Sequence, residues 1–297
     1  MLKIWKDWQR RQRRNKNRKI ALDEASVLFI SPAKSGRTWI RVMLSHAYHL
    51  TYGTPVDAVI ARDNFHRVDA RIPNFFFTHI TKEAANVRKL ITPVAQAGKA
   101  VIGIVRDPRD VAVSLFHHLS HRSQGDRRSE PGASASDRGE LFPFLVSNRQ
   151  GLPFVIERMN EVKRFVDQHE NATLFRYEDF KRDAPGELRR MLRALGNEVP
   201  MTSIEAAVEF ARFENLQKRE AEGFFATRIL QPGDPEEPNS FKVRRGKVGG
   251  YLDDLLPEQI AELDHIVDKT LIKGLGYRSE ERDRGSQVPT TAATLAG

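Results

Sequence analysis

The sequence predicts an α/β fold, a single domain in which helices flank a central, mostly parallel sheet. Short β-rich apolar runs at residues 27–30 and 100–106 are each followed by a turn and then by apolar residues at helical spacing. The second run is almost continuously apolar, which is typical of a central strand covered by helices on both faces. Strand, turn and helix therefore occur twice, as in α/β proteins with parallel sheets.

Composition sets limits on the class of protein. At 297 residues the chain is long enough to bury one large core. It has no cysteine, which excludes disulfides and thiolate catalysis and favours an intracellular setting. No apolar run approaches the roughly 20 residues that cross a bilayer, and the start does not resemble a secretory signal. We therefore expect a cytoplasmic protein, and peripheral attachment to the inner face of the membrane stays open.

The positive charge is concentrated in an N-terminal arm. Of the net charge of +9, residues 1–19 carry +8, so the rest of the chain is close to neutral. Four apolar residues of the arm share one side of a helical wheel: Leu2, Ile4, Trp5 and Trp8. An apolar face followed by a basic run is typical of an interfacial helix on an anionic membrane, and a solvated, disordered tail is the alternative. Nucleic acid is a less favoured partner.

The first turn is a candidate anion site. It joins the strand at 27–30 to a helix that contains Ile40, Met43 and Leu44, and it leaves the first N–H groups of that helix free. Side chains that suit an anion gather there: Lys34, Ser35, Arg37 and Thr38. A nucleoside-triphosphate loop would have a second glycine before the lysine, whereas this turn has only Gly36, after it. The turn therefore favours a different phosphate ester.

The second strand-to-helix connection predicts another anion site. Asp107 is a good N-cap and Pro108 suits the first position of a helix that extends to about residue 119. Arg106, Arg109 and Ser114 surround this helix start. Two anion sites suit a nucleotide that is phosphorylated at two positions.

A third strand is expected at residues 74–79, and it ends in His79. Ligands of parallel sheets bind outside the carboxyl ends of the strands, so His79 lies where a catalytic group belongs. A fourth strand is expected at 172–177. Apolar residues at helical spacing predict further helices at 83–99, 154–169, 185–195, 203–212 and 257–273.

Both predicted anion sites resemble those of sulfotransferases that use 3′-phosphoadenosine 5′-phosphosulfate (PAPS). The run Lys34-Ser35-Gly36-Arg37-Thr38-Trp39 resembles the 5′-phosphosulfate loop of that family, P-K-S-G-x-T-W, with Ala33 in place of the proline. The run from Arg106 to Ser114 resembles the family's 3′-phosphate motif. Thr78-His79-Ile80 partly matches T-H-L-P, which contains the family's general base.

Three later segments extend the resemblance to about residues 25–277. Tyr177-Glu178-Asp179 resembles the family's Y-E-D segment, whose tyrosine lies near the adenine, and Phe213 falls where members place an aromatic residue against that base. The run Arg244-Arg245-Gly246 resembles the segment that covers the 3′-phosphate. Gly250 and Tyr251 replace the aspartate and tryptophan that follow there in the family.

The resemblance implies transfer of a sulfuryl group from PAPS to a hydroxyl or amine, without a metal. It implies catalytic roles for His79 as general base, for Lys34 at the bridging oxygen of the leaving phosphate, and for Ser114. Thr38 and the N–H groups of residues 35–39 would hold the 5′-phosphosulfate, and Trp39 would stack on the adenine. The remaining cofactor-binding residues that it implies are Arg106, Ser114, Tyr177, Phe213, Arg244, Arg245 and Gly246. The P-loop-like sulfotransferase fold is the expected architecture.

We therefore divide the chain into a basic arm at 1–24, a sulfotransferase domain at 25–277 and a disordered tail at 278–297. A polar, glycine- and serine-rich stretch at 121–140 is expected to be a mobile insert. The acceptor, a small molecule, lipid or carbohydrate, and the oligomeric state stay open.

Two alternatives to this function are open. One is a Mg²⁺-dependent nucleotide kinase or phosphotransferase with a degenerate phosphate loop. The other is a non-catalytic nucleic-acid- or membrane-binding module that acts through the arm.

Overall fold

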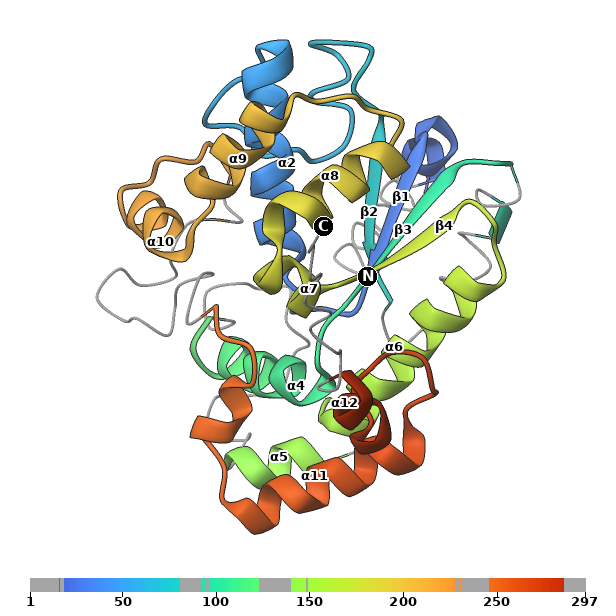
Figure 1. The fold of residues 1–297 in the computed structure, drawn as a ribbon, viewed down its shortest axis with the longest axis vertical. Helices are drawn as coiled ribbons and strands as arrows, with labels where there is room; N and C mark the ends of the chain where they lie inside the picture. The colour runs from blue at the N-terminus through green and yellow to red at the C-terminus, as the bar shows by residue number, and fades with distance from the viewer. Residues whose placement is uncertain are drawn as a thin grey trace, which may run out of the picture.

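The computed structural model describes residues 16, 19–80, 92–93, 97–122, 140–147, 149–227, 230 and 246–285. Four parallel strands form one sheet in the order β2-β1-β3-β4 (Figure 1). The strands are β1 (Val27–Ser31), β2 (Phe75–His79), β3 (Ala100–Val105) and β4 (Ala172–Arg176). The predicted class, a single α/β domain with a parallel central sheet, is confirmed.

Helices cover both faces of this sheet. The bounds of those that contribute to the site or to the cores are α2 (Arg37–Tyr52), α4 (Pro108–His117), α6 (Leu152–Asp167), α7 (Tyr177–Arg182), α8 (Ala184–Ala194), α9 (Met201–Phe210), α10 (Phe213–Ala221) and α11 (Pro257–Thr270). The shorter elements are the π-helical turn η1 (His118–Arg122), α5 (Leu141–Val146), the 3-10 turn η5 (Gly250–Asp253) and α12 (Ser279–Gly285). Helices α5, α7 and α10 were not expected from the sequence.

Two hydrophobic cores lie on opposite faces of the sheet because successive strand residues point in opposite directions. In β1, Leu28 and Ile30 pack with α4, α6 and α11, whereas Val27 and Phe29 pack with α2, α8 and α9. Gly103 of β3 lets α6 approach closely, since a Cβ there would lie 2.8 Å from a methyl group of Val166. Burial on both faces explains why the central strands are almost continuously apolar.

The C-terminal tail corrects one prediction. Disorder was expected from residue 278, but α12 begins at Ser279 and is held to the domain by its own side chains. The backbone N–H of Gly276 donates to the Glu281 carboxylate at 2.9 Å, and Arg282 pairs with Asp264 of α11 at 3.1 Å. A polar composition predicted disorder here because sequence periodicity does not reveal such long-range pairs.

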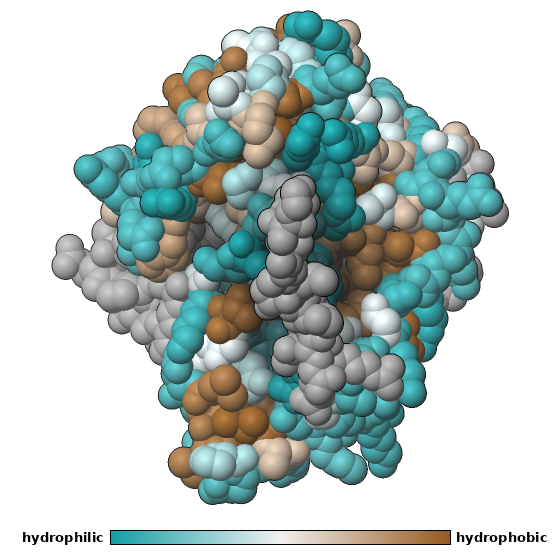
Figure 2. Space-filling model, in the orientation of Figure 1, coloured by the Kyte–Doolittle hydropathy of each residue, from teal (hydrophilic) through white to brown (hydrophobic). Residues whose placement is uncertain are grey.

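Several predicted segments lie largely outside the described residues. They are most of the arm at 1–24, most of the helix at 83–99, most of the insert at 121–140, and the tail beyond 285. In the part of the chain that the structure does describe, no helix combines the length and the apolar character that a membrane span requires. Figure 2 shows a mainly hydrophilic face with a hydrophobic patch at its lower end, where α5 and the start of α11 lie in Figure 1.

The sheet brings the functional segments to one edge. Ser31, the last residue of β1, is in register with His79, the last residue of β2. Arg106 follows β3 directly and Tyr177 follows β4 directly. Because all four strands are parallel, their carboxyl ends meet at the same edge, which is where α/β proteins bind ligands.

Candidate active site

A cavity of about 760 Å³ lies at the carboxyl edge of the sheet. Its volume is within the range of small-molecule and cofactor sites. Most of the predicted site residues line it: Lys34, Gly36, Arg37, Thr38, Trp39, His79, Arg106, Ser114, Tyr177, Phe213 and Gly246. Ser35 is buried beside the cavity, and Arg244 and Arg245 lie outside the described residues. The two predicted phosphate-binding segments therefore open into one shared space.

The start of α2 offers backbone donors to a ligand. Gly36 is the N-cap residue, with φ +81°, and neither a side-chain cap nor an acidic residue in the first turn occupies the N–H groups. Lys34 also has a positive φ, +68°, an uncommon conformation for a residue other than glycine. The buried Ser35 hydroxyl has no hydrogen-bond partner in the described part of the chain. A helix start with free donors and an unpaired buried hydroxyl suits an anion.

Gly36 is required for close packing as well as for backbone conformation. A Cβ at this position would lie 2.4 Å from Cδ2 of Tyr177, which is closer than real Cβ contacts. The Tyr177 ring thus lies directly against the turn, and its hydroxyl donates to the carbonyl of Gly246 at 3.3 Å. One tyrosine therefore connects the first anion site to the C-terminal segment.

His79 lies in the cavity with its ring held at both nitrogens. Nε2 is 2.8 Å from Nη2 of Arg37, which donates to it. Nδ1 is 3.4 Å from both the carbonyl and the hydroxyl of Ser31. Since Arg37 can only donate, Nε2 is the accepting nitrogen and Nδ1 bears the hydrogen. This tautomer keeps the lone pair that a general base requires on Nε2, where Arg37 now donates to it.

Two arginines of α2, the half-buried Arg37 and the buried Arg41, line the cavity that contains His79. Burial lowers the pKa of Arg37 to about 9, and the nearby positive charge of Arg41 adds to this effect. Burial also lowers the pKa of Arg41 to about 10. Arg37 occupies the variable position of the loop motif, and Arg41 follows one helical turn later. Both line the cavity, so its wall near His79 is strongly positive.

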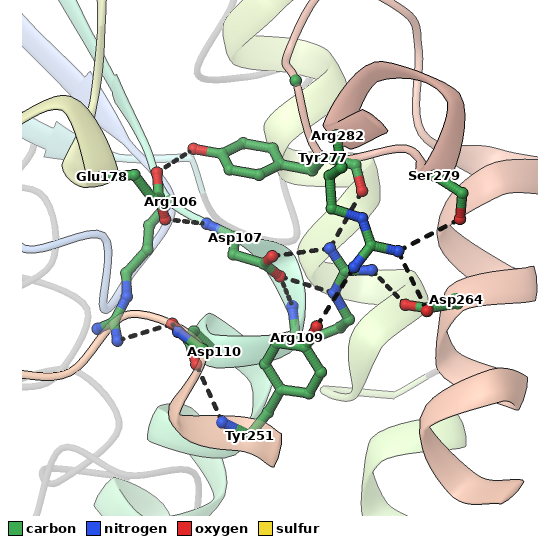
Figure 3. Close-up of polar contacts among 12 residues, drawn as sticks. Arg106, Asp107, Arg109, Asp110, Glu178, Tyr251, Asp264, Tyr277, Ser279 and Arg282 are labelled. Carbon is green, nitrogen blue, oxygen red and sulfur yellow. Dashed lines mark hydrogen bonds and ion pairs between the residues drawn. The ribbon is translucent and has the colours of Figure 1, made fainter. Parts of the chain in front are cut away.

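The start of α4 differs from the predicted second anion site. As expected, Asp107 caps this helix, with its carboxylate accepting from the Arg109 backbone N–H at 2.9 Å, and Pro108 is at the first position. Arg109, however, points away from the cavity and is fully buried, where it pairs with Asp107 and with Asp264 of α11 (Figure 3). The expectation that Arg109 surrounds an anion site is therefore wrong, because the chain's own carboxylates occupy this helix start.

Arg106 and Ser114 are the residues of this segment that line the cavity. Arg106 lies over the Tyr177 ring at 4.5 Å, pairs with Asp110 at 3.2 Å and donates to the carbonyl of Lys247 at 2.9 Å. Asp110 in turn accepts the backbone N–H of Gly249 at 3.0 Å and that of Tyr251 at 3.1 Å (Figure 3). Asp110 therefore holds the C-terminal segment 246–251 against α4.

Aromatic side chains form another wall of the cavity. The Trp39 ring is 5.5 Å from that of Tyr177 in an edge-on arrangement, and its Nε1 donates to the carbonyl of Ala211 at 2.7 Å. Phe213 begins α10 and packs against Gly246, where a Cβ would lie 2.8 Å from the ring. Lys181 lies over Trp39 at 5.3 Å. Three aromatic rings at one end of a positive cavity suit the base of a nucleotide.

Sequence reasoning missed several cavity residues, among them Arg41, Asp110 and Lys181. Arg41 and Lys181 each follow a predicted site residue, Arg37 and Tyr177, by four positions, so they share a helix face with it. That spacing was a usable signal. Nothing local indicates the role of Asp110, because its backbone partners lie about 140 positions later in the chain.

Comparison with known proteins agrees with this geometry. A family model described as "Sulfotransferase domain" matches residues 24–275. The chain belongs to the sulfotransferase family. The predicted family is thereby confirmed, together with PAPS-dependent sulfuryl transfer as the activity. Neither the kinase nor the non-catalytic binding module is favoured.

Curated relatives of this sulfotransferase are distant. Cytosolic sulfotransferase 14 of Arabidopsis thaliana is 23% identical, and the match covers 85% of this chain and 77% of the relative. Flavonol 4′-sulfotransferase of Flaveria chlorifolia is 22% identical, with coverage of 82% and 78%. The similarity therefore extends over most of each protein.

Solved structures support the fold. Mouse sulfotransferase SULT7A1 complexed with PAP superimposes on this sulfotransferase with a TM-score of 0.58 and 16% identity, covering 89% of both chains. Retinol dehydratase in complex with retinol and PAP gives a TM-score of 0.55 and 18% identity, covering 84% of both chains. The P-loop-like sulfotransferase fold, expected from the sequence, is confirmed.

Proposed function

We propose that the 5′-phosphosulfate of PAPS binds at the start of α2, where the N–H groups of residues 35–39 and the hydroxyl of Thr38 hold it. Arg106 and Ser114, with the segment that begins at Gly246, bind the 3′-phosphate, and Trp39, Tyr177 and Phe213 surround the adenine. The observation that carries this proposal is that both phosphate-binding segments line one cavity with His79. The residues suit such a ligand, since the Ser35 hydroxyl is buried and unpaired among the described residues.

His79 acts as the general base in this proposal. PAPS supplies the sulfuryl group, whose bond to the bridging phosphate oxygen breaks as a bond to the acceptor oxygen forms. Nε2 of His79 takes the acceptor's proton once the acceptor hydroxyl replaces Arg37 at that nitrogen. Hydrogen on Nδ1, directed at Ser31, keeps the lone pair on Nε2. Lys34 stabilises the charge that develops on the leaving phosphate.

The acceptor is proposed to be a small molecule with a hydroxyl or amine. This is supported by the names of the relatives, which include a flavonol sulfotransferase and a retinol-binding neighbour. A lipid or carbohydrate acceptor is compatible with the same chemistry. A cytoplasmic location is supported by the "cytosolic" relatives.

Sulfate transfer from ³⁵S-labelled PAPS into a lysate of the source organism tests the site assignment. We expect His79→Ala to lower the rate by about 10²–10⁴-fold, the usual contribution of a general base. Lys34→Ala should lower the rate while the protein still binds PAP, measured as a PAP-dependent rise in melting temperature. Transfer at the native rate by both variants would show that the assignment is wrong.

Matched controls use residues of the same type outside the cavity. His265→Ala changes an exposed histidine of α11, and Lys218→Ala an exposed lysine of α10 whose side chain is 76% accessible. Both should transfer sulfate at the native rate. A loss in these variants equal to that of His79→Ala would mean that the assay reports stability instead of chemistry.

A membrane contact through residues 1–19 is also proposed, from their charge and apolar face. The full chain should sediment with phosphatidylserine-containing vesicles, whereas the chain that lacks these residues should stay in the supernatant. Both chains should transfer sulfate equally. Equal sedimentation of the two chains would contradict this proposal.

A further inference from the structure

Two arginines on successive turns of α2 face the cavity next to the proposed base. Arg41 follows Arg37 by about 6 Å along the helix axis, and both line the cavity wall that contains His79. Arg41 is 6% exposed, so its charge is almost completely removed from bulk water. Two neighbouring positive charges with little access to water need other groups to offset the loss of hydration and their mutual repulsion.

Their protein partners supply only neutral groups. Arg37 donates to the carbonyl of Thr78 and to Nε2 of His79, each at 2.8 Å. Arg41 donates through Nε to the carbonyl of Ile60 at 2.6 Å. Both guanidinium groups approach the ring of Phe77, at 5.9 Å and 4.7 Å from its centroid. Across the described ranges, no carboxylate forms an ion pair with either arginine.

Arg109 shows how the same fold treats a buried arginine that serves structure alone. It is fully buried and forms ion pairs with Asp107 and Asp264. Burial of a charge without an opposite charge is unfavourable, and two neighbouring like charges add repulsion. A ligand anion at Arg37 and Arg41 would remove both penalties. The contrast with Arg109 therefore indicates a binding function for this pair.

The cofactor accounts for Arg37 better than for Arg41. Arg37 belongs to the loop that is proposed to hold the 5′-phosphosulfate. Arg41 lies one turn further along α2 and so away from that loop. It contacts the carbonyl of Ile60 and the ring of Phe77, a residue of β2. Trp39, proposed for the adenine, lies on α2 as well, but it contacts Tyr177 and the carbonyl of Ala211. The other two rings proposed for the adenine, those of Tyr177 and Phe213, contact Gly246. The region at Arg41 is thus the acceptor's part of the cavity.

We infer that the acceptor carries an oxyanion, such as a carboxylate, sulfate or phosphate, which Arg41 binds together with Arg37 while the acceptor hydroxyl lies at Nε2 of His79. This inference rests on the proposed function, because it assigns the acceptor's end of the same cavity. Arg37 leaves Nε2 of His79 to pair with the incoming anion, which frees the base at the moment the acceptor binds. The acceptor class is therefore a hydroxylated acid, not a neutral alcohol or phenol.

The test compares each acid with its methyl ester at saturating PAPS. The probes are 3-(4-hydroxyphenyl)propionate and 12-hydroxydodecanoate, each as acid and as ester, and the readout is the ratio of kcat/KM for acid over ester. We expect the native enzyme to prefer the acid at least tenfold. Arg41→Gln should reduce this ratio at least tenfold, mainly through KM, whereas Arg41→Lys, which keeps the charge, should retain most of it.

Arg67→Gln is the matched control, because Arg67 is 76% exposed and pairs with Asp63 at the surface. Its ratio should stay within twofold of the native value. If Arg41 instead acted on the sulfuryl group, Arg41→Gln would slow acid and ester equally, and the inference would be overturned. A native ratio near one would overturn it as well.

A binding measurement makes the test independent of turnover. Saturation-transfer NMR with PAP-saturated protein should detect benzoate but not benzamide, and the benzoate signal should disappear in Arg41→Gln and persist in Arg67→Gln. Failure of the native protein to bind PAP would overturn the proposed function and this inference with it. PAP binding and ester turnover without benzoate binding or a preference for acids would overturn the inference alone.

Discussion

The starts of α2 and α4 are built on the same plan but differ in what occupies them. Each follows a buried parallel strand, and each has a basic residue close to the turn. At α2 the N-cap is Gly36, which has no side chain to cap the helix, and the first turn contains no acidic residue. At α4 the N-cap is Asp107, whose carboxylate accepts a backbone N–H and also binds Arg109. One helix start is open to a ligand and the other is closed by the protein.

This difference separates binding from stability. The open start of α2 offers backbone donors to the proposed anion, and its turn holds Lys34, a residue other than glycine, at a positive φ. The closed start of α4 anchors α11 through Asp264 and the chain near Tyr277, whose carbonyl accepts from Arg109 at 3.0 Å. Similar local sequences therefore have different functions, and the neighbouring carboxylates decide which one applies.

The largest effect, a loss of PAP affinity, is expected from a substitution at the open start of α2. Gly36→Ala places a Cβ against the Tyr177 ring and forces a positive φ on alanine. We expect PAP affinity to fall by about 100-fold, as the loss of two or three N–H contacts of roughly 1 kcal/mol each predicts. Isothermal calorimetry measures this. Gly53→Ala is the control, with φ +71° and no atom within 4 Å of the added Cβ, and it should retain PAP affinity.

A substitution at the closed start of α4 should lower the free energy of unfolding. Arg109→Met leaves Asp107 and Asp264 without their shared cation, and removal of one partner of a buried pair costs about 3–5 kcal/mol. Urea unfolding should show this loss in the free energy of unfolding. Arg182→Met, at an exposed arginine of α7, should change it by less than about 1 kcal/mol. A loss of less than about 1 kcal/mol for Arg109→Met would contradict the stabilising role given to the start of α4.

Arg106 tests whether the closed start still contributes to binding. Arg106→Gln should lower PAP affinity by about tenfold, because charge-assisted hydrogen bonds contribute roughly 1.5–3 kcal/mol each. AMP, which lacks the 3′-phosphate, should bind the variant and the native enzyme alike. Competition binding with both nucleotides measures the difference. Equal losses for PAP and AMP would assign Arg106 a structural role only.

The smallest expected effect is a pH dependence at the closed start. Burial raises the pKa of Glu178, whose carboxylate accepts the Asp107 N–H at 2.8 Å. The folded state therefore binds the carboxyl proton of Glu178 more tightly than the unfolded state does. As a consequence, the contribution of Glu178 to stability falls as the pH rises above the usual pKa of a glutamate. Glu178→Gln removes this titration, so its unfolding free energy relative to the native protein should increase between pH 4.5 and 7. A pH-independent difference would contradict the assignment.

Local sequence was sufficient for most elements of the fold. The four strands were predicted from short apolar runs, and the Asp107-Pro108 start of α4 from cap chemistry, because each signal is local. Helices α5, α7, α10 and α12 were missed. The polar α12 is held by the contact of its Arg282 with Asp264, which lies on α11. Tyr177 begins α7 instead of ending β4, a boundary shift of one residue.

The sequence alone determined the family, the reaction and the segments that line the cavity, because phosphate loops are encoded in short runs such as Lys34 to Trp39. Only the tertiary structure decided which arginines find carboxylate partners and which do not. Arg109 and Arg41 both lie on helices that follow parallel strands, but Arg109 finds carboxylates whereas Arg41 finds a carbonyl and a ring. The energy of a buried charge depends on neighbours that are distant in the chain, and these become known only when the helices pack.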